Sequence, residues 1–208
     1  MVEWINLPGL VNYNESLLMM EERVEKVING SEDETIYLLE HEDVYTAGTS
    51  ANNKELLGTN HIPVIYTGRG GKFTYHGPGQ RVIYPILNLS LKHRKKDIKL
   101  YIKNLENWII STLAQVGIRA YTIPGKIGIW TYELGKPAKI AAIGVRVKKW
   151  VTYHGIAVNI TTNLENYSGI IPCGINNFPV TSLDRLTAKI DMKEFDSILK
   201  KQFEIYFK

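Results

Sequence analysis

The single cysteine of this 208-residue chain, Cys173, has the sequence surroundings of a candidate nucleophile. Pro172 and Gly174 flank it, and such residues fix a turn that exposes the side chain between them. Residues 163–178 are rich in glycine, proline and asparagine, which is typical of a loop. A lone cysteine can equally be a buried small hydrophobic residue, so both roles are open at this point. One cysteine excludes an internal disulfide and a thiolate metal cluster.

A nucleophilic cysteine needs an activating partner, because a free thiol with a pKa of about 8.5 is mostly protonated at neutral pH. The five histidines follow no metal-binding spacing, and the roles of His41, His76 and His154 are left open by the sequence. Lys139 precedes the apolar run 140–145. A lysine there is usually a solvated edge residue, but burial would lower its pKa and let it act as a base.

A glycine segment, residues 68–80, reads Gly-Arg-Gly-Gly-Lys-Phe-Thr-Tyr-His-Gly-Pro-Gly-Gln. Five glycines let a backbone turn tightly and approach a ligand, and the polar residues between them favour a ligand-site wall over a purely structural loop. Phosphate binding is poorly supported. The dinucleotide pattern requires Gly-x-Gly-x-x-Gly before a helix, and a P-loop requires Ser or Thr after Gly-Lys, where this chain has Phe73.

Composition and charge indicate an ordinary soluble globular protein with a net charge of +4. No apolar run approaches the ~20 residues of a membrane span, and the N-terminus lacks signal-peptide features, so we expect a cytoplasmic protein. A basic run, residues 92–99, is rich in lysine. It is either a solvated face or a docking patch for an acidic partner, a nucleic acid or a protein.

The pattern of elements predicts a mixed α+β fold in a single domain, residues 1–208. Capping residues and apolar periodicity indicate helices over 12–30 and 97–117, with a short one over 192–203. Strands are expected at 35–39, 62–66, 81–89, 118–123, 127–132, 139–147 and 150–160. Pro85 suggests an edge strand or a bulge. Frequent hairpins favour a largely antiparallel sheet with packed helices over a doubly wound parallel sheet.

The last two strands predict a hairpin with an unusual face. A two-residue turn at 148–149 would set Gly144 opposite Tyr153 and Ala142 opposite Gly155. One face then carries a small-residue strip, Ala142, Gly144, Gly155 and Ala157. Such a strip suits either a thin aliphatic chain or a closely packed helix. Strict alternation sets Lys139 on the opposite face, unless the strand bulges near its start.

Four segments together resemble the lipoyl(octanoyl) transferases. They are 40–48 (Glu-His-Glu-Asp-Val-Tyr-Thr-Ala-Gly), the part of the glycine segment from Arg69 to Gln80, the pair Lys-Ile-Ala-Ala-Ile-Gly (139–144) and His-Gly-Ile-Ala-Val-Asn (154–159), and Pro-Cys-Gly (172–174). The resemblance covers about residues 35–185, and the second segment is its most specific part.

The resemblance implies a biotin/lipoate protein ligase-like fold and transfer of an octanoyl or lipoyl group from acyl carrier protein, without a cofactor or metal. The acceptors it implies are lysines of lipoyl domains in 2-oxoacid dehydrogenase E2 subunits and of the glycine cleavage H protein. It implies Cys173 as the nucleophile that forms an acyl thioester and Lys139 as its partner. The implied substrate-binding residues are Arg69, Gly70, Gly71, Lys72, Phe73, Thr74, Tyr75, His76, Ala142, Ile143, Gly144, Gly155, Ile156 and Ala157.

Two alternatives differ in class. An ATP-dependent lipoate or biotin ligase of the same fold needs an adenylate site and no nucleophilic cysteine. A non-enzymatic nucleic-acid-binding module would use the basic run and show strongly salt-dependent binding. The balanced charge of the rest of the chain disfavours the second alternative, and we expect neither nucleic acid nor membrane as a partner.

Overall fold

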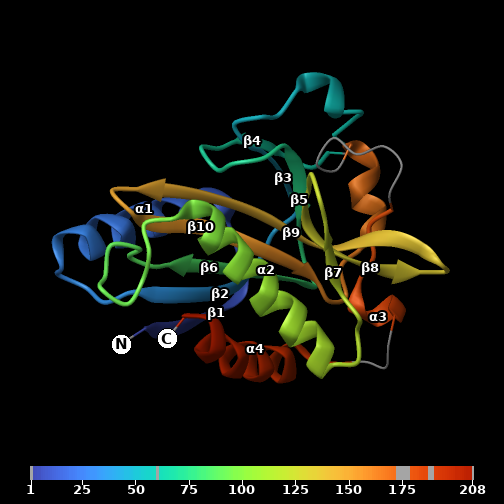
Figure 1. The fold of residues 1–208 in the computed structure, drawn as a ribbon. Coiled ribbons are helices and arrows are strands. Elements are labelled where there is room, and N and C mark those ends of the chain that lie inside the picture. The colour runs from blue at the N-terminus through green and yellow to red at the C-terminus, as the bar shows by residue number, and fades with distance from the viewer. Residues whose placement is uncertain (1, 60, 172–178, 187–189, 208) are drawn as a thin grey trace.

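The computed structural model describes residues 2–59, 61–171, 179–186 and 190–207, in which two sheets and four α-helices are arranged in layers (Figure 1). The strands are β1 (Glu3–Val11), β2 (Thr35–His41), β3 (Val44–Ala47), β4 (Val64–Tyr66), β5 (Phe73–His76), β6 (Gln80–Ile86), β7 (Tyr121–Ile123), β8 (Lys126–Glu133), β9 (Lys136–Lys148) and β10 (Val151–Asn159). The helices are α1 (Tyr13–Asn29), α2 (Ile98–Gln115), α3 (Leu183–Leu186) and α4 (Met192–Phe207), and 3-10 turns form η1 (Asn53–Glu55) and η2 (Leu164–Gly169).

The larger sheet has seven strands in the order β1-β2-β6-β10-β9-β8-β7, and the smaller has the order β4-β3-β5. The pairs β1/β2 and β3/β4 are parallel and the other paired strands are antiparallel. This arrangement confirms the predicted mixed, largely antiparallel α+β fold. In the described part of the chain, no helix is both long and apolar enough to cross a membrane.

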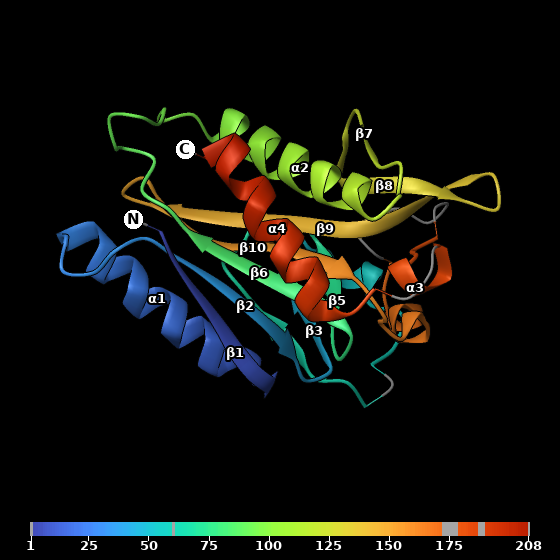
Figure 2. The same ribbon diagram turned by 90° about the horizontal axis from the view of Figure 1, so that it is seen from below.

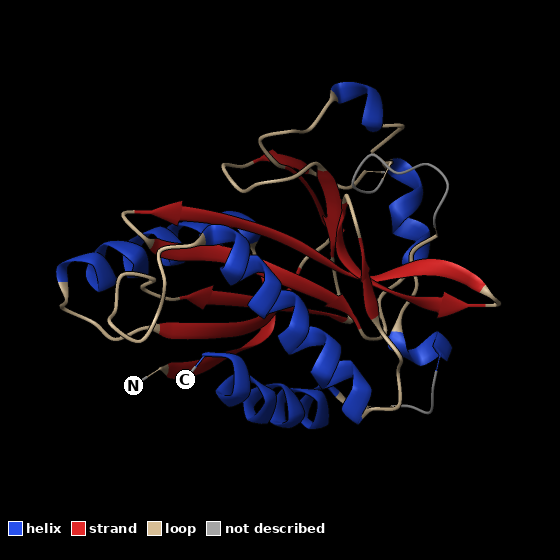
Figure 3. Ribbon diagram, in the orientation of Figure 1, coloured by secondary structure: helices blue, strands red, loops and turns tan. Residues whose placement is uncertain are grey.

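Helices cover both faces of the large sheet, as Figures 2 and 3 show: α1 lies on one face, and α2 and α4 lie on the other. Alternate residues of each strand serve the two cores. Leu38 and Ile83 pack with α2 and α4, whereas Leu39 and Val82 pack with α1. The small sheet encloses a third core around Tyr45, shared with η2. Period-two alternation therefore sorts the side chains of the large sheet into two buried layers.

The two long helices begin where their capping residues predict. The Asn12 side chain accepts a hydrogen bond from the backbone N–H of Asn14 at the start of α1, and Asp97 accepts one from Leu100 in α2. Gly30 ends α1 in the left-handed conformation, with φ of 77°. The C-terminal helix α4 extends beyond the predicted range to Phe207.

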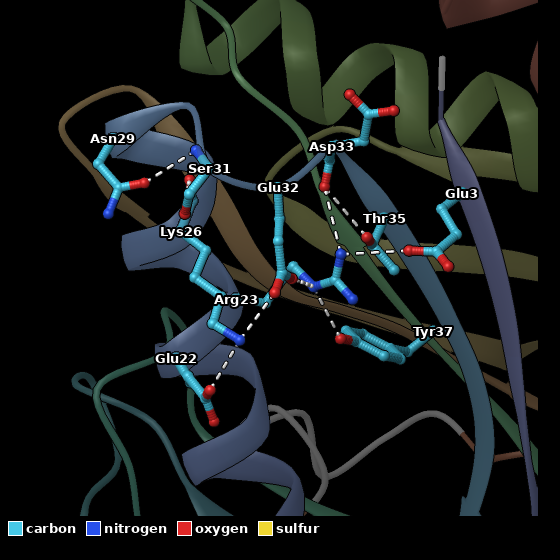
Figure 4. A network of polar contacts seen from close by, with 10 residues as sticks. All are labelled: Glu3, Glu22, Arg23, Lys26, Asn29, Ser31, Glu32, Asp33, Thr35 and Tyr37. Carbon is cyan, nitrogen blue, oxygen red and sulfur yellow. Dashed lines mark hydrogen bonds and ion pairs between the residues drawn. The ribbon is translucent and has the colours of Figure 1, made fainter.

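A polar network fixes the C-terminal half of α1 against the sheet (Figure 4). Arg23 donates a hydrogen bond to the Tyr37 hydroxyl of β2 and makes ion pairs with Glu3 of β1 and Glu32. Lys26 pairs with the same Glu32. The network anchors one end of α1 and leaves the other end, with Tyr13, beside the glycine segment.

Several sequence predictions are corrected by the structure. Pro85 lies in β6, an interior strand, so the prediction of an edge strand is wrong. The sheet is nevertheless irregular at Pro85, because β6 pairs with β10 only from Gln80 to Ile83. Strand β1 was missed because its residues are mostly exposed or half-buried and lack alternation. Strands β3 and β5 lie inside the polar motif segments 40–48 and 69–80, which have no strand-like apolar pattern to predict them.

The β9–β10 hairpin is two residues out of the predicted register. Its turn residues are Lys149 and Trp150, both in the left-handed region, so Gly144 pairs with Gly155 and Ala142 with Ala157. A two-residue shift preserves the face of every side chain, because strand residues alternate with a period of two. The small-residue strip therefore survives the correction.

Candidate active site

A cleft of about 690 Å³ lies between the glycine segment and the β9–β10 hairpin. Its lining contains twelve of the residues expected to bind substrate: Arg69, Gly70, Gly71, Lys72, Thr74, His76, Ala142, Ile143, Gly144, Gly155, Ile156 and Ala157. It also contains residues that were not singled out as substrate-binding: Tyr13, Ser50, Val82, Tyr84, Ile98, Ile102, Gly125, Lys126, Ile127, Val145 and His154. The structure thus brings two segments about seventy residues apart in the sequence to one cavity.

The two expected residues outside this lining are Phe73 and Tyr75. Both side chains are fully buried in the core of the small sheet. Residues 73–76 form strand β5, so their side chains alternate between two sides, and Thr74 and His76 are the ones that reach the cleft. The glycine segment is half loop and half strand.

The glycine segment is held against β9 by backbone contacts. The N–H of Gly70 donates to the carbonyl of Val145 at 2.9 Å. A Cβ on Gly144 would lie 2.9 Å from the Gly70 oxygen, and one on Gly155 would lie 2.2 Å from the Ile83 oxygen of β6. These two glycines are therefore required by neighbouring backbone, whereas Ala157, at the end of the strip, packs in the core that contains α1.

Arg69 holds the shape of the glycine segment from within. Each of its nitrogens donates a hydrogen bond: Nε to the Thr46 hydroxyl at 3.2 Å, Nη1 to the Gly70 carbonyl at 3.0 Å, and Nη2 to the carbonyls of Thr46 at 2.7 Å and Lys72 at 2.9 Å. The side chain is 6% exposed. The planar guanidinium fork suits such a role, because it bonds several acceptors from one fixed position.

His41 and His76 lie side by side near the cleft, with ring centroids 5.6 Å apart. His41 Nδ1 donates to the Val11 carbonyl at 2.8 Å, so its Nε2 is left to accept from the Tyr84 hydroxyl at 2.7 Å. Burial lowers the pKa of His41 to about 4. Burial, followed by the nearby His41 and Arg69, lowers the pKa of His76 well below its ordinary value. Both rings are neutral at physiological pH.

A chain of hydrogen bonds connects His76 to the end of β10. His76 Nδ1 lies 2.7 Å from Gln80 Oε1, and Gln80 Nε2 donates to Asn159 Oδ1 at 3.0 Å. Asn159 in turn donates to the Thr181 carbonyl at 3.0 Å. The glycine segment is thereby tied to the chain that follows residue 178.

His154 is the most unusual side chain of the cleft. It is 1% exposed and its backbone is in the left-handed region, with φ of 55°. Neither ring nitrogen has a hydrogen-bond partner within the described ranges. Burial, and to a lesser degree Arg69 and Arg146, lowers its pKa to about 3, so the ring is neutral.

Lys139 is buried, 5% exposed, and its ammonium nitrogen lies 5.1 Å from the centre of the Trp130 ring. The register between β8 and β9 shifts at this point, since Ile129 pairs with Ala141 and Trp130 with Lys139. The bulge that the alternation argument allowed for is therefore present, and Lys139 lies outside the cleft lining that the described residues form. The backbone of Lys139 also bonds to Pro179 and Thr181, next to the segment that contains the cysteine.

Cys173 and its neighbours Pro172 and Gly174 lie outside the described residues, so their predicted roles stay predictions. On the near side of that segment, the Ile171 N–H donates to the Glu55 carbonyl at 2.7 Å. Among the cleft residues that sequence reasoning missed, Tyr13 and Tyr84 could have been identified as candidates. Each is a polar aromatic residue, Tyr13 at the start of a helix and Tyr84 in a buried strand.

Comparison with known proteins agrees with this geometry. A family model described as the lipoyl protein ligase A/B catalytic domain matches residues 12–204. An octanoyltransferase of Rickettsia bellii is 59% identical over 209 residues, covering 100% of both chains. An octanoyltransferase of Rickettsia prowazekii is 58% identical over the same length and coverage.

Solved structures support the fold. A bipartite lipoate protein ligase of Thermoplasma acidophilum, solved in work that includes its E2 lipoyl domain, matches with a TM-score of 0.70 and 15% identity, covering 99% of this chain and 82% of that one. The biotin protein ligase of Aquifex aeolicus matches with a TM-score of 0.54 and 13% identity, covering 98% and 68%. The chain therefore belongs to the lipoyl protein ligase A/B catalytic domain family, as an acyltransferase that carries out octanoyl transfer in protein lipoylation.

Proposed function

We propose that the chain transfers the octanoyl group from acyl carrier protein through a thioester on Cys173. The Cys173 thiolate attacks the carbonyl carbon of octanoyl-acyl carrier protein, and the bond from that carbon to the pantetheine sulfur breaks. The departing sulfur takes a proton from the Lys139 ammonium. The amine of an acceptor lysine then attacks the Cys173 thioester, gives a proton to the now neutral Lys139, and displaces the Cys173 thiolate. The amide product is more stable than the thioester, so ATP is not consumed.

The observation that carries this proposal is a cleft of small and apolar residues next to a buried lysine on the same strand. Ala142 and Ile143 line the cleft, and Lys139 lies three residues before Ala142 in β9. Transfer of an octanoyl chain from water to such a cleft stabilises the complex by about 0.8 kcal/mol per methylene, or ~5 kcal/mol in total. The Lys139 ammonium lies 5.1 Å from the centre of the Trp130 ring, within the range of a cation–π contact.

The proposed acceptors are lipoyl domains, in the E2 subunits of 2-oxoacid dehydrogenases and in the glycine cleavage H protein. The Thermoplasma ligase described above was solved in work that includes an E2 lipoyl domain. We place the reaction in the cytoplasm, where reducing conditions keep a lone thiol available.

The basic run is the proposed docking patch for acyl carrier protein. Lys92, Lys95, Lys96 and Lys99 are exposed, and Ile98 and Ile102, which follow in α2, line the cleft. Arg94 has a different role, because it is largely buried and forms an ion pair with Glu34. Replacing Lys92 and Lys95 by Glu should raise KM for octanoyl-acyl carrier protein. Lys54→Glu, at an exposed position in η1, is the control. An unchanged KM contradicts docking at this patch.

Mass spectrometry tests the thioester. Incubation with octanoyl-acyl carrier protein should add one octanoyl group to Cys173, and an apo lipoyl domain should then remove it without ATP. Cys173→Ser should abolish the thioester and the ATP-independent transfer. Attachment of free octanoate by Cys173→Ser in the presence of ATP would instead favour the ATP-dependent ligase mechanism.

Two Lys139 variants separate charge from proton transfer. Lys139→Arg retains a cation that cannot accept a proton, whereas Lys139→Met retains only the packing. We expect Lys139→Met to slow both half-reactions by about 10²–10⁴-fold and Lys139→Arg to slow chiefly the second. Equal rates of deacylation in the wild type and Lys139→Arg would show that Lys139 is not the base.

A further inference from the structure

His154 points to the wrong side of its strand for regular alternation. Its neighbours Tyr153 and Ala157 pack with α1, so an alternating residue 154 would face α2. Instead, the His154 ring stacks on Tyr153 with centroids 5.0 Å apart and lies edge-on to Tyr84 at 6.3 Å. Both tyrosines belong to the core on the α1 side. The left-handed backbone therefore turns the imidazole to the face that carries the small-residue strip.

Pro85 explains how the sheet tolerates this conformation. Ile156 pairs with Ile83, and the same register sets His154 opposite Pro85. Proline has no N–H to donate, so one of the two hydrogen bonds of a regular antiparallel pair is missing here whatever conformation residue 154 adopts. Histidine is among the residues that adopt positive φ more readily than most. A left-handed residue in an interior strand is a strained feature of the kind that gathers at ligand sites.

The hydrogen-bonding capacity of the His154 imidazole is also unused. Throughout the part of the chain that the structure describes, both its nitrogens lack a hydrogen-bond partner, although each polar group of the neighbouring His41 ring has one. The charged groups that affect the pKa of His154 are Arg69 and Arg146, and neither side chain can accept a hydrogen bond. Buried polar groups in folded proteins almost always have a hydrogen-bond partner, so a ligand or solvent must supply the bond.

The order of residues along the hairpin fixes the end of the cleft at which His154 lies. Lys139 comes first on β9, then Ala142, Gly144 and finally Val145, which pairs with His154. With a rise of about 3.3 Å per residue, Val145 and its partner His154 lie about 10 Å beyond Ala142, the first residue of β9 in the cleft lining, and about 20 Å beyond Lys139. The first of these distances is close to the length of an extended octanoyl chain. If the reacting carbonyl lies beside Ala142, at the Lys139 end of the cleft, as in the proposed function on which this step rests, His154 lies just beyond the last carbon of an octanoyl chain.

We propose that His154 is a specificity-determining residue that gives the acyl slot along the small-residue strip a polar distal end. The slot accepts medium-chain acyl groups with a hydrogen-bonding atom on the last carbon, such as a terminal hydroxyl, as well as octanoyl. It disfavours longer saturated chains. An octanoyl chain ends short of the imidazole and leaves it to solvent, whereas a decanoyl chain covers the ring and offers no hydrogen bond.

The test compares octanoyl, decanoyl and 8-hydroxyoctanoyl thioesters of acyl carrier protein, with kcat/KM for transfer to an apo lipoyl domain as the readout. His154→Asn and His154→Leu have similar size and differ in polarity, and asparagine tolerates the left-handed backbone. Ratios between substrates are taken within each variant, so a partly unfolded preparation does not alter them. His61→Leu is the matched control, because His61 is exposed and has φ of 65°.

We expect the wild type to prefer octanoyl over decanoyl by about tenfold, the equivalent of ~1.4 kcal/mol for one unpaired polar group. His154→Leu should lose this preference, and its kcat/KM for hydroxyoctanoyl relative to octanoyl should fall about tenfold. His154→Asn and His61→Leu should keep the wild-type ratio of kcat/KM between hydroxyoctanoyl and octanoyl. If His154→Leu does not fold, His154→Gly, which is unstrained there, takes its place.

Equal ratios in the Asn and Leu variants, or rejection of hydroxyoctanoyl by the wild type, would overturn the proposal. Failure of octanoyl transfer itself, or its dependence on ATP, would overturn the proposed function instead.

Discussion

The cleft has two walls, the glycine segment and the β9–β10 hairpin, and their polar groups are treated differently. In the glycine segment, every nitrogen of Arg69 donates to an acceptor of the protein, including backbone carbonyls of Thr46 and Lys72. In the hairpin, both nitrogens of His154 are buried without a partner among the described residues. The first wall uses its polar groups to hold its shape, and the second keeps one for a ligand.

The difference is instructive because the sequence points the other way. In the sequence, Arg69 and His76 of the glycine segment are the more obvious candidates for ligand binding. His154 is followed by the apolar run 155–158 and attracts less attention. A polar side chain whose bonds are all made inside the protein acts through the shape of the backbone. Three perturbations test this difference between the two walls, and they follow in order of decreasing expected effect.

Acid should give the largest effect, because it acts on His154 in the hairpin and on His41 of β2, which lies beside His76 of the glycine segment. Burial lowers the pKa of His41 to about 4 and of His154 to about 3, whereas an unfolded histidine titrates at about 6.5. Between these values the unfolded chain binds more protons than the native one, so stability falls as pH falls. The two histidines together should cost about 5 kcal/mol between about pH 6.5 and about pH 4.5, at ~1.4 kcal/mol per pH unit each. Urea unfolding at several pH values measures this slope.

Carboxyl groups also contribute to acid unfolding, so a variant is needed to isolate one histidine. His154→Asn should reduce the slope by about 1.4 kcal/mol per pH unit, and the exposed His61→Asn should leave it unchanged. Identical slopes in the wild type and His154→Asn would show that His154 is not buried in its neutral form in solution.

Arg69→Ala should break the glycine wall alone. It leaves the buried carbonyl of Thr46 without its donor and removes the links to Gly70 and Lys72. We expect a loss of about 3 kcal/mol of unfolding free energy and a raised KM for octanoyl-acyl carrier protein, since the wall loses its shape. Arg69→Lys should recover little, because an ammonium cannot form the fork. Denaturant unfolding and steady-state kinetics measure both effects; a variant with wild-type stability would disprove the structural role.

Local sequence signals predicted the parts of the fold that depend on them. Asn12 and Gly30 bound α1, and Asp97 starts α2, because caps act within one helical turn. Register and topology depend on distant residues. The turn at Lys149 and Trp150 has no glycine or asparagine to mark it, and the residue opposite Pro85 is His154, whose backbone is left-handed.

The candidate site was predicted in a similarly uneven way. The glycine segment and the small-residue strip do meet at one cleft, since both carry residue types that few other settings require. Phe73 and Tyr75 were assigned to the site because they stand inside the motif, but strand alternation directs them into the core. His154 was left without a role because its orientation arises from a backbone angle, which residue type alone does not reveal.

Gly144→Ala should press the two walls apart and gives the smallest effect. The new Cβ would lie 2.9 Å from the Gly70 oxygen, so the glycine segment must move by a few tenths of an ångström. Overpacking of this kind costs about 1–3 kcal/mol. KM for octanoyl-acyl carrier protein should rise, because Gly70 and Gly144 line the same cleft. Gly58→Ala is the matched control, since a Cβ there meets nothing within 4 Å and its φ is not positive. If both substitutions left stability and KM unchanged, the contact between Gly70 and Gly144 would not set the width of the cleft.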